Sequence, residues 1–171
     1  MCVTFLYYDI AINNTILAAL SSISSDQSKA TKNTAKQVAK LLNYLDSNPC
    51  GAEIQYRASG MQLAIHSEVS YLSVSQARSR VSGVHFLSEG PPNLNNTEKK
   101  LPTVNNILLV VCNIMRNIMA SAAEAKYGTI FVNAQTAVPI RTSLTEMGWK
   151  QGPPAIQVEN STSVGIATKE S

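Results

Sequence analysis

Cysteine and histidine are scarce in this chain, and each shortage excludes a class of protein. The 171 residues include three cysteines, which are far apart and form no C-x-x-C pair: Cys2, Cys50 and Cys112. A disulfide scaffold and a finger-type zinc site are therefore not expected. The two histidines, His66 and His85, leave little material for a histidine-based site.

Long apolar runs and a strong charge excess are also missing. The longest apolar run, Ile107–Cys112, is far shorter than the roughly 20 residues that span a bilayer, and the first residues lack the basic leader of a signal peptide. Fourteen Lys and Arg against eleven Asp and Glu give a net charge of +3, which is too small to indicate nucleic-acid binding by itself. We expect an intracellular chain without a membrane span.

The chain does contain enough apolar material for a packed domain with a small appendage, since 44% of its residues are hydrophobic. Tyr7–Ser25 fits either a strand or a short helix, because its apolar residues show no clean period. A helical period follows, with one face made of Thr34, Val38, Leu41, Leu42 and Leu45. We therefore expect a short helical segment over residues 1–50, ahead of a domain over residues 51–171.

Within residues 51–171, strands and helices alternate. Five stretches have the alternation or the buried apolar character of strands: Ala52–Arg57, Met61–Ser67, Val81–Ser88, part of Val104–Met119, and Ala155–Val158. The first two flank Ala58-Ser59-Gly60 and are expected to form a hairpin. Tyr71–Arg80 and Glu89–Leu101 are expected to be loops, because turn-forming and polar residues dominate them.

Helix signals dominate the second half of the chain. Ser121 is predicted to cap a helix that ends near Thr136, with Glu124 completing a capping box. Pro139 suits the first turn of a second helix, and another helix is expected to start near Asn160.

This order predicts an α/β domain with a mixed sheet. The strands Met61–Ser67, Val81–Ser88 and Val104–Met119 are expected to form an antiparallel meander. Ala155–Val158 should join beside Met61–Ser67 in parallel, after a right-handed crossover through the helix that follows Ser121.

Three carboxylates lie where predicted elements meet. Glu68 follows the strand Met61–Ser67, Glu124 lies in the first turn of a helix, and Glu159 follows the strand Ala155–Val158. If the helix covers the face that carries Glu68 and Glu159, the three groups converge. Such an oxygen cluster suits Mg²⁺, and two ions of this kind would clamp the reacting oxygens of a phosphodiester. The alternative is that the strand-end residues are solvated and Glu124 only caps its helix.

Other polar residues allow two interpretations. Arg78 and Arg80 could hold phosphates or could be solvated in their loop. His66 suits a core position better than a catalytic base. Ser121 and Ser161 are expected to be helix caps, because no His/acid pattern accompanies either as a nucleophile.

Three motifs, in order, resemble the ribonuclease H domain of copia-type retrotransposon polyproteins. His66–Ser73 (HSEVSYLS) followed by Ala77–Arg80 (ARSR) resembles its first catalytic strand and loop. Met119–Gly128 (MASAAEAKYG) resembles the second motif, and Gln157–Thr162 (QVENST) resembles the third. Thr34–Leu45 is similar to the segment that links reverse transcriptase to ribonuclease H.

The resemblance implies a ribonuclease H-like domain, with a mixed five-stranded sheet and helices on its faces, preceded by a helical connection segment over residues 1–50. It implies hydrolysis of the RNA strand of RNA–DNA hybrids with Mg²⁺ or Mn²⁺, and an upstream reverse transcriptase. Carried over position by position, the catalytic and metal-binding residues would be Glu68, Glu124 and Glu159. The nucleic-acid-binding residues would be Arg78, Arg80, Asn160 and Ser161.

The chain departs from the family pattern at the candidate site. The family has Asp where this chain has Glu68 and Glu159, and Lys126 stands where another acid is common. An extra methylene moves a carboxylate by about 1.5 Å, and a misplacement of about 1 Å can cost on the order of 10²-fold in rate. Three interpretations stay open: a weakened nuclease, a catalytically inactive module that binds nucleic acid or protein, and an unrelated α/β fold with surface acids.

Overall fold

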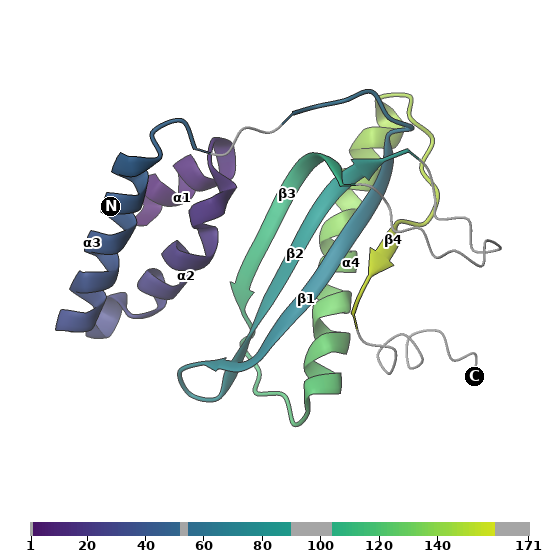
Figure 1. Ribbon diagram of the computed structural model, residues 1–171. Helices are drawn as coiled ribbons and strands as arrows, with labels where there is room; N and C mark the ends of the chain where they lie inside the picture. The colour runs from purple at the N-terminus through teal and green to yellow at the C-terminus, as the bar shows by residue number, and fades with distance from the viewer. Residues whose placement is uncertain (1, 52–54, 90–103, 160–171) are drawn as a thin grey trace. The chain divides into compact units, whose positions relative to one another are not determined.

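The computed structural model describes residues 2–51, 55–89 and 104–159. The chain divides into two compact units, Met1–Ile54 and Gln55–Ser171, which are described separately (Figure 1). The helix predicted near Asn160 and most of the predicted loop Glu89–Leu101 lie outside these residues. No helix in the described ranges is long and apolar enough to cross a membrane.

The first unit is helical. In its described residues it contains α1 (Cys2–Ala11), η1 (Asn14–Ile16), α2 (Leu17–Ser25), η2 (Gln27–Lys29) and α3 (Lys32–Ser47). Of the two alternatives for Tyr7–Ser25, the helical one is correct. The side chains of Ile16, Leu20, Ile23 and Leu41 form the core of this unit.

A reciprocal cap fixes the start of α3. The Thr31 hydroxyl accepts a hydrogen bond from the Thr34 amide (3.3 Å), and the Thr34 hydroxyl accepts one from the Thr31 amide (3.1 Å). These two bonds satisfy amides that the first turn of a helix leaves without partners, so α3 begins sharply after Thr31.

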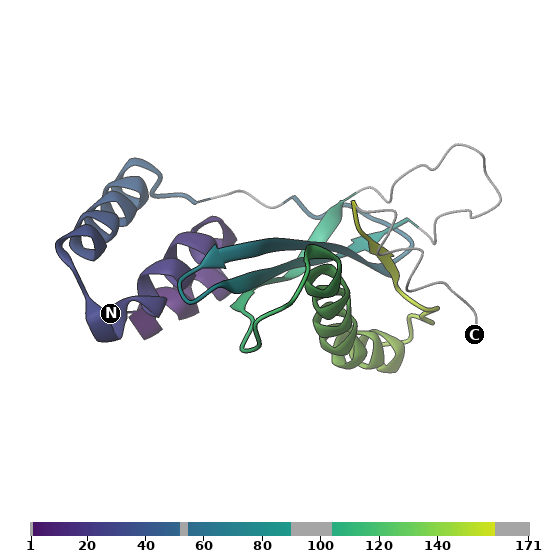
Figure 2. The same cartoon turned by 90° about the horizontal axis from the view of Figure 1, so that it is seen from below.

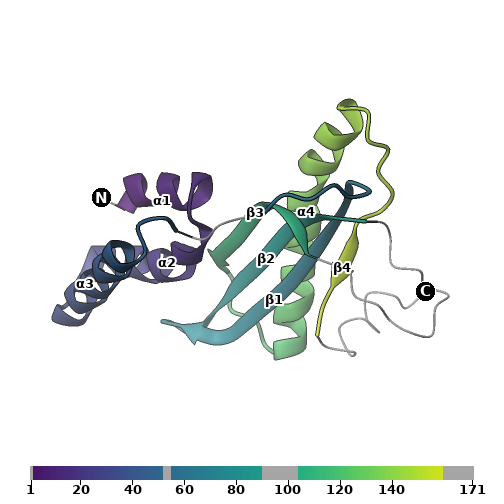
Figure 3. The same ribbon diagram turned by 45° about the horizontal axis from the view of Figure 1, so that its top comes forward.

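The second unit is a mixed sheet with one long helix. Its described elements are β1 (Gln62–Val74), β2 (Arg78–Ser88), β3 (Asn105–Ile114), α4 (Ala122–Glu146) and β4 (Ala155–Gln157). The strand order is β3-β2-β1-β4, with β4 parallel to β1 and the other pairs antiparallel (Figure 3). The predicted α/β class, meander and parallel pairing are confirmed. The described residues form four strands, whereas the resemblance implies five.

The hairpin lies later in the chain than predicted. Residues 55–61 form no strand, so the described part of the predicted strand Ala52–Arg57 is coil and the hairpin at Ala58-Ser59-Gly60 is wrong. The tight turn lies instead between β1 and β2, where Gln76 and Ala77 have φ values of 63° and 52°. Two successive left-handed residues reverse the chain within the few positions between the strands.

Both strands extend into the predicted loop Tyr71–Arg80. Ser70 pairs with Arg80 and Val74 pairs with Arg78, across an irregularity in the register. Pairing with a neighbouring strand decides the structure here, because local composition is only a weak guide to strands. Glu68 therefore lies within β1, not after its end as predicted.

α4 is one continuous helix. Pro139 predicts a new helix, but α4 runs through it. Ala137, Ile140 and Leu144 continue along one face against the sheet. Their burial outweighs the hydrogen bond that the proline nitrogen cannot make.

The core of the second unit lies between α4 and one face of the sheet (Figure 2). Near the C-terminal half of α4, Leu63 and Ile65 of β1 pack against Ala137 and Leu144. Near its N-terminal half, a second cluster consists of Val69, Val81, Val111, Met115 and Ala125.

Candidate functional site

The three carboxylates were predicted to converge if α4 covered the face of β1 that carries Glu68. In the structure, α4 covers the opposite face of β1. Alternation places His66 and Glu68 on one face and Leu63, Ile65 and Val69 on the other. The second set packs against α4. Burying Leu, Ile and Val is favoured over burying His and Glu, because removal of apolar surface from water drives packing.

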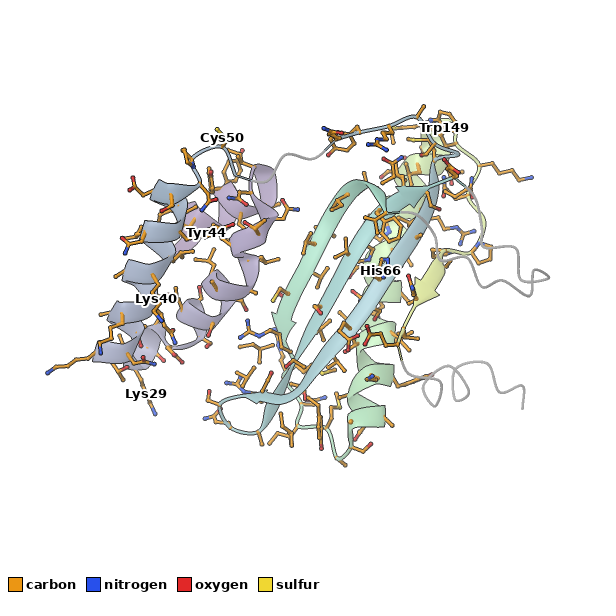
Figure 4. The ribbon with its side chains drawn as sticks, in the orientation of Figure 1. Lys29, Lys40, Tyr44, Cys50, His66 and Trp149 are labelled. Atoms are coloured by element: carbon orange, nitrogen blue, oxygen red, sulfur yellow. The ribbon has the colours of Figure 1, made fainter. Side chains whose placement is uncertain are left out.

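Glu68 and Glu159 nevertheless meet, at the edge of the sheet where β4 ends. His66, labelled in Figure 4, pairs with Gln157, the last residue of β4. Both carboxylates lie two residues beyond that pair. They line a small crevice together with Lys126 of α4. The structure thus brings together two of the three predicted acids, and both are exposed to solvent.

Glu68 uses its carboxylate locally. Its Oε1 accepts a hydrogen bond from the Val69 amide at 3.1 Å. Leu63, near the start of β1, lies six residues before Val69, so the amides of the two residues point to the same side of the strand. The Leu63 amide donates to Gln151 Oε1 at 3.0 Å. Both amides therefore point toward the β4 side of β1. Because the Val69 amide lies beyond the end of β4, the Glu68 carboxylate serves as its hydrogen-bond acceptor.

Glu124 serves as a helix cap. Ser121 Oγ accepts a hydrogen bond from the Glu124 amide at 3.1 Å, and Glu124 Oε2 accepts one from the Ala120 amide at 2.6 Å. The predicted cap at Ser121 is confirmed. Glu124 is not among the residues that line the crevice, so the capping interpretation accounts for it.

The residues present do not fit the metal site that the resemblance implies. Nowhere in residues 2–51, 55–89 and 104–159 do three His, Cys, Asp or Glu side chains come together as a set that could hold a metal ion. Glu68, Glu159 and Lys126, with its ammonium group, line the crevice, which is too narrow to admit a water molecule. That ammonium group competes with a divalent cation for the same oxygens.

The predicted nucleic-acid-binding residues fall on the hairpin or outside the described chain. Arg78 is half-buried, and its Nε donates to a carbonyl of the turn at 3.4 Å. The register of β1 and β2 places Arg80 on the same sheet face as Glu68, away from α4. Asn160 and Ser161 lie outside the described residues.

A buried polar network behind the crevice was not predicted. Asn133 Nδ2 donates to Ser67 Oγ (2.9 Å) and to the Ser82 carbonyl (3.1 Å), and the Asn133 carbonyl lies 3.2 Å from His85 Nε2. Burial lowers the pKa of His85, although hydrogen bonds to backbone groups oppose this, so the ring is neutral at pH 7 and donates to Asn133. A sequence signal for this network was present, because Asn133 lies one turn before Ala137 and is thus a polar residue on the apolar face of a helix.

Comparison with known proteins adds no assignment. No family model, curated protein or solved structure matches the chain. Any function proposed for the chain therefore depends on its motifs and on the geometry of the crevice.

Proposed function

We propose that Gln55–Ser171 is a ribonuclease H-like domain of the copia type, which binds RNA–DNA hybrids and hydrolyses their RNA strand much more slowly than a domain with Asp at positions 68 and 159. The observation that carries this proposal is the crevice that Glu68 and Glu159 share. These residues come from two motifs far apart in the sequence, and each lies two residues beyond the last parallel pair of β1 and β4, His66 with Gln157. Adjacent strand ends are also where α/β sheets place their sites.

Two features support slow hydrolysis. Glu68 and Glu159 carry longer, more flexible side chains than Asp, and catalytic groups need to be held within about 0.5 Å of their productive positions. Lys126 places a positive charge in the same crevice. Both features reduce the precision or the charge with which a reacting phosphate and its cations could be held.

A second candidate function is a catalytically inactive module that binds nucleic acid or protein. Lys126 favours this alternative, because it adds a positive charge to the lining of the crevice, the same sign of charge that a divalent cation would supply. Glu124 favours it too, because its carboxylate is committed to the Ala120 amide. Cleavage assays separate the two candidates.

We expect Lys126→Glu to increase cleavage of a labelled RNA–DNA hybrid about tenfold in Mg²⁺, and further in Mn²⁺. The change replaces a cation by a third carboxylate in the crevice, which then has a donor set that suits either ion. For the same reason, millimolar Mg²⁺ should raise the melting temperature of the variant more than that of the unaltered chain. Gel electrophoresis of the labelled RNA strand measures the first effect and thermal unfolding the second.

Lys150→Glu is the matched control, because it makes the same charge change at an exposed position of the same unit outside the crevice. It should leave cleavage unchanged, and Glu68→Gln should abolish whatever cleavage the chain has. Equal cleavage by the unaltered chain and Glu68→Gln would place the activity elsewhere or in a contaminant. If Lys126→Glu binds Mg²⁺ and the hybrid but does not cleave, the inactive-module alternative is correct.

The hairpin is expected to contribute to hybrid affinity. Arg78→Gln should weaken hybrid binding and reduce the slope of log affinity against log salt by about 1, because each phosphate contact releases roughly one counterion. Arg141→Gln, which removes the same charge from an exposed site on α4, should change neither quantity. Fluorescence anisotropy over a salt series measures the affinity and the slope. Equal slopes for the two variants would show that the hairpin does not contact the nucleic acid.

A further inference from the structure

A groove between α2 and α3 has the dimensions of a small-molecule site. Its volume is about 440 Å³, and all of its lining residues belong to the first unit. Ligand sites in proteins usually measure roughly 300–1,000 Å³ and are mostly apolar with a few placed polar groups. The groove lies outside the ribonuclease H-like unit, so its ligand does not depend on the function proposed above.

The walls of the groove are apolar and well anchored. Ile16 and Ile23 line it from one side and Leu41 from the other. These three side chains also form the core of the first unit, where they are 1%, 6% and 8% exposed. Ala19 lines the groove as well, and its small side chain leaves space that a larger residue would fill. An apolar body placed here would therefore contact a preformed surface.

The lining of the groove includes polar groups contributed by neighbouring elements. The Tyr44 hydroxyl lies 3.1 Å from Thr15 Oγ1, a hydrogen bond between two lining residues that links α3 to η1. Figure 4 labels Tyr44 and Lys40 on α3, one turn apart. Tyr44 and Lys40 thus contribute a hydroxyl and a cation, one turn apart on α3, to the lining of the groove.

The polar groups specify the chemistry of a ligand. Lys40 is the only charged residue among the described residues that line the groove. Gln37 also lines it, and its buried Oε1 has no hydrogen-bond partner in the described part of the chain. A buried acceptor without a partner costs free energy that a donor on a ligand would recover. The ammonium group of Lys40 favours an anionic group at the rim.

We propose that this groove binds a free amphipathic organic anion, with an apolar body between α2 and α3, an acidic group at Lys40 and a hydrogen-bond donor facing Gln37. The ligand is a small molecule in solution, such as a long-chain or aromatic acid. Its charge distinguishes it from neutral apolar compounds, which the same walls would accept without the contribution of Lys40.

Fluorescence titration of the full chain with 1-anilinonaphthalene-8-sulfonate tests the proposal, because this probe combines an aromatic body, a sulfonate and an N–H donor. We expect saturable binding at one site, with displacement by dodecanoate and not by dodecan-1-ol. Lys40→Gln should weaken probe binding about tenfold, as expected for loss of one hydrogen bond to a charged group.

Two variants make the test specific. Lys36→Gln removes the same charge one turn earlier on α3, from an exposed residue that does not line the groove, and should leave affinity unchanged. Ala19→Phe should abolish binding by filling the groove, while circular dichroism shows that the helices remain. The proposal is overturned if Lys36→Gln and Lys40→Gln weaken binding equally, if dodecan-1-ol displaces the probe as well as dodecanoate does, or if Ala19→Phe binds normally.

Discussion

Gly83→Ala is expected to destabilise the second unit by about 3 kcal/mol, because it drives a methyl group into the buried network around Asn133. A Cβ at position 83 would lie 2.6 Å from Asn133 Cγ and 2.8 Å from Asn133 Nδ2. Asn133 is fully buried in α4, so its side chain cannot turn out to solvent without disturbing the packing around it. Displacing it breaks its hydrogen bonds to the Ser67 hydroxyl and the Ser82 carbonyl.

Trp149 makes this effect measurable. It is the only tryptophan of the chain and belongs to the second unit. Its side chain is 47% exposed in the folded state, so its fluorescence should be followed together with circular dichroism, which reports loss of the sheet and of α4. A loss of about 3 kcal/mol should lower the melting temperature by about 10 °C for a unit of this size. Gly152→Ala is the matched control, because a Cβ there meets no atom within 4 Å and its change should be close to zero.

A double variant identifies the cause. Asn133→Ala removes the side chain that the new methyl group would strike, so Gly83→Ala should cost little when it is added to Asn133→Ala. The two changes should therefore be strongly non-additive, as expected for groups in direct contact. Additive effects, or equal melting temperatures for Gly83→Ala and Gly152→Ala, would show that the close approach of α4 to β2 is not required for stability.

The strand topology was predictable because it depends on local periods and on general rules of chain connection. The alternating strands, the cap at Ser121 and the preference for right-handed crossovers place Ala155–Val158 beside Met61–Ser67, as the structure confirms. The extension of β1 beyond Ser67 was not predictable in this way. It depends on pairing with residues of β2, which no local pattern records.

The candidate site was predicted less well, because it depends on which face of β1 is buried. The prediction needed α4 to cover the face of His66 and Glu68, but the face with Leu63 and Ile65 is more apolar and is the one that α4 covers. The alternation of apolar and polar residues in β1 contained this signal. Glu68 and Glu159 still line the same crevice, because β4 ends at Gln157, two residues before Glu159. Where β4 ends depends on its tertiary pairing with β1 and not on a local sequence pattern.

Asp9→Asn is expected to stabilise the first unit at neutral pH by on the order of 2 kcal/mol. Asp9 is fully buried in α1, and neither of its carboxylate oxygens has a hydrogen-bond partner in the described part of the chain. Burial raises its pKa from 3.8 to about 6. A charged carboxylate in such a position lacks both water and a compensating partner, whereas asparagine has nearly the same shape and no charge.

The sign of the pH dependence follows from the raised pKa. The folded state of the first unit favours the protonated form of Asp9, so the folded state binds more protons than the unfolded state between pH 3.8 and about 6. The stability of the unit should therefore fall as pH rises through this window, and the full cost should be present above it. Below pH 3.8 Asp9 is neutral in both states, and Asp9→Asn should then change stability little.

Native-state hydrogen exchange of α1 peptides at pH 4 and pH 7.5 measures this difference, once rates are corrected for the intrinsic effect of pH. Asp9→Asn should slow exchange at pH 7.5 by more than tenfold relative to the unaltered chain, and by much less at pH 4, since about 1.4 kcal/mol corresponds to a factor of ten. Asp46→Asn, at an exposed position on α3, should change neither value. Equal stabilisation by Asp9→Asn at both pH values would mean that packing of the amide, and not removal of a buried charge, is responsible.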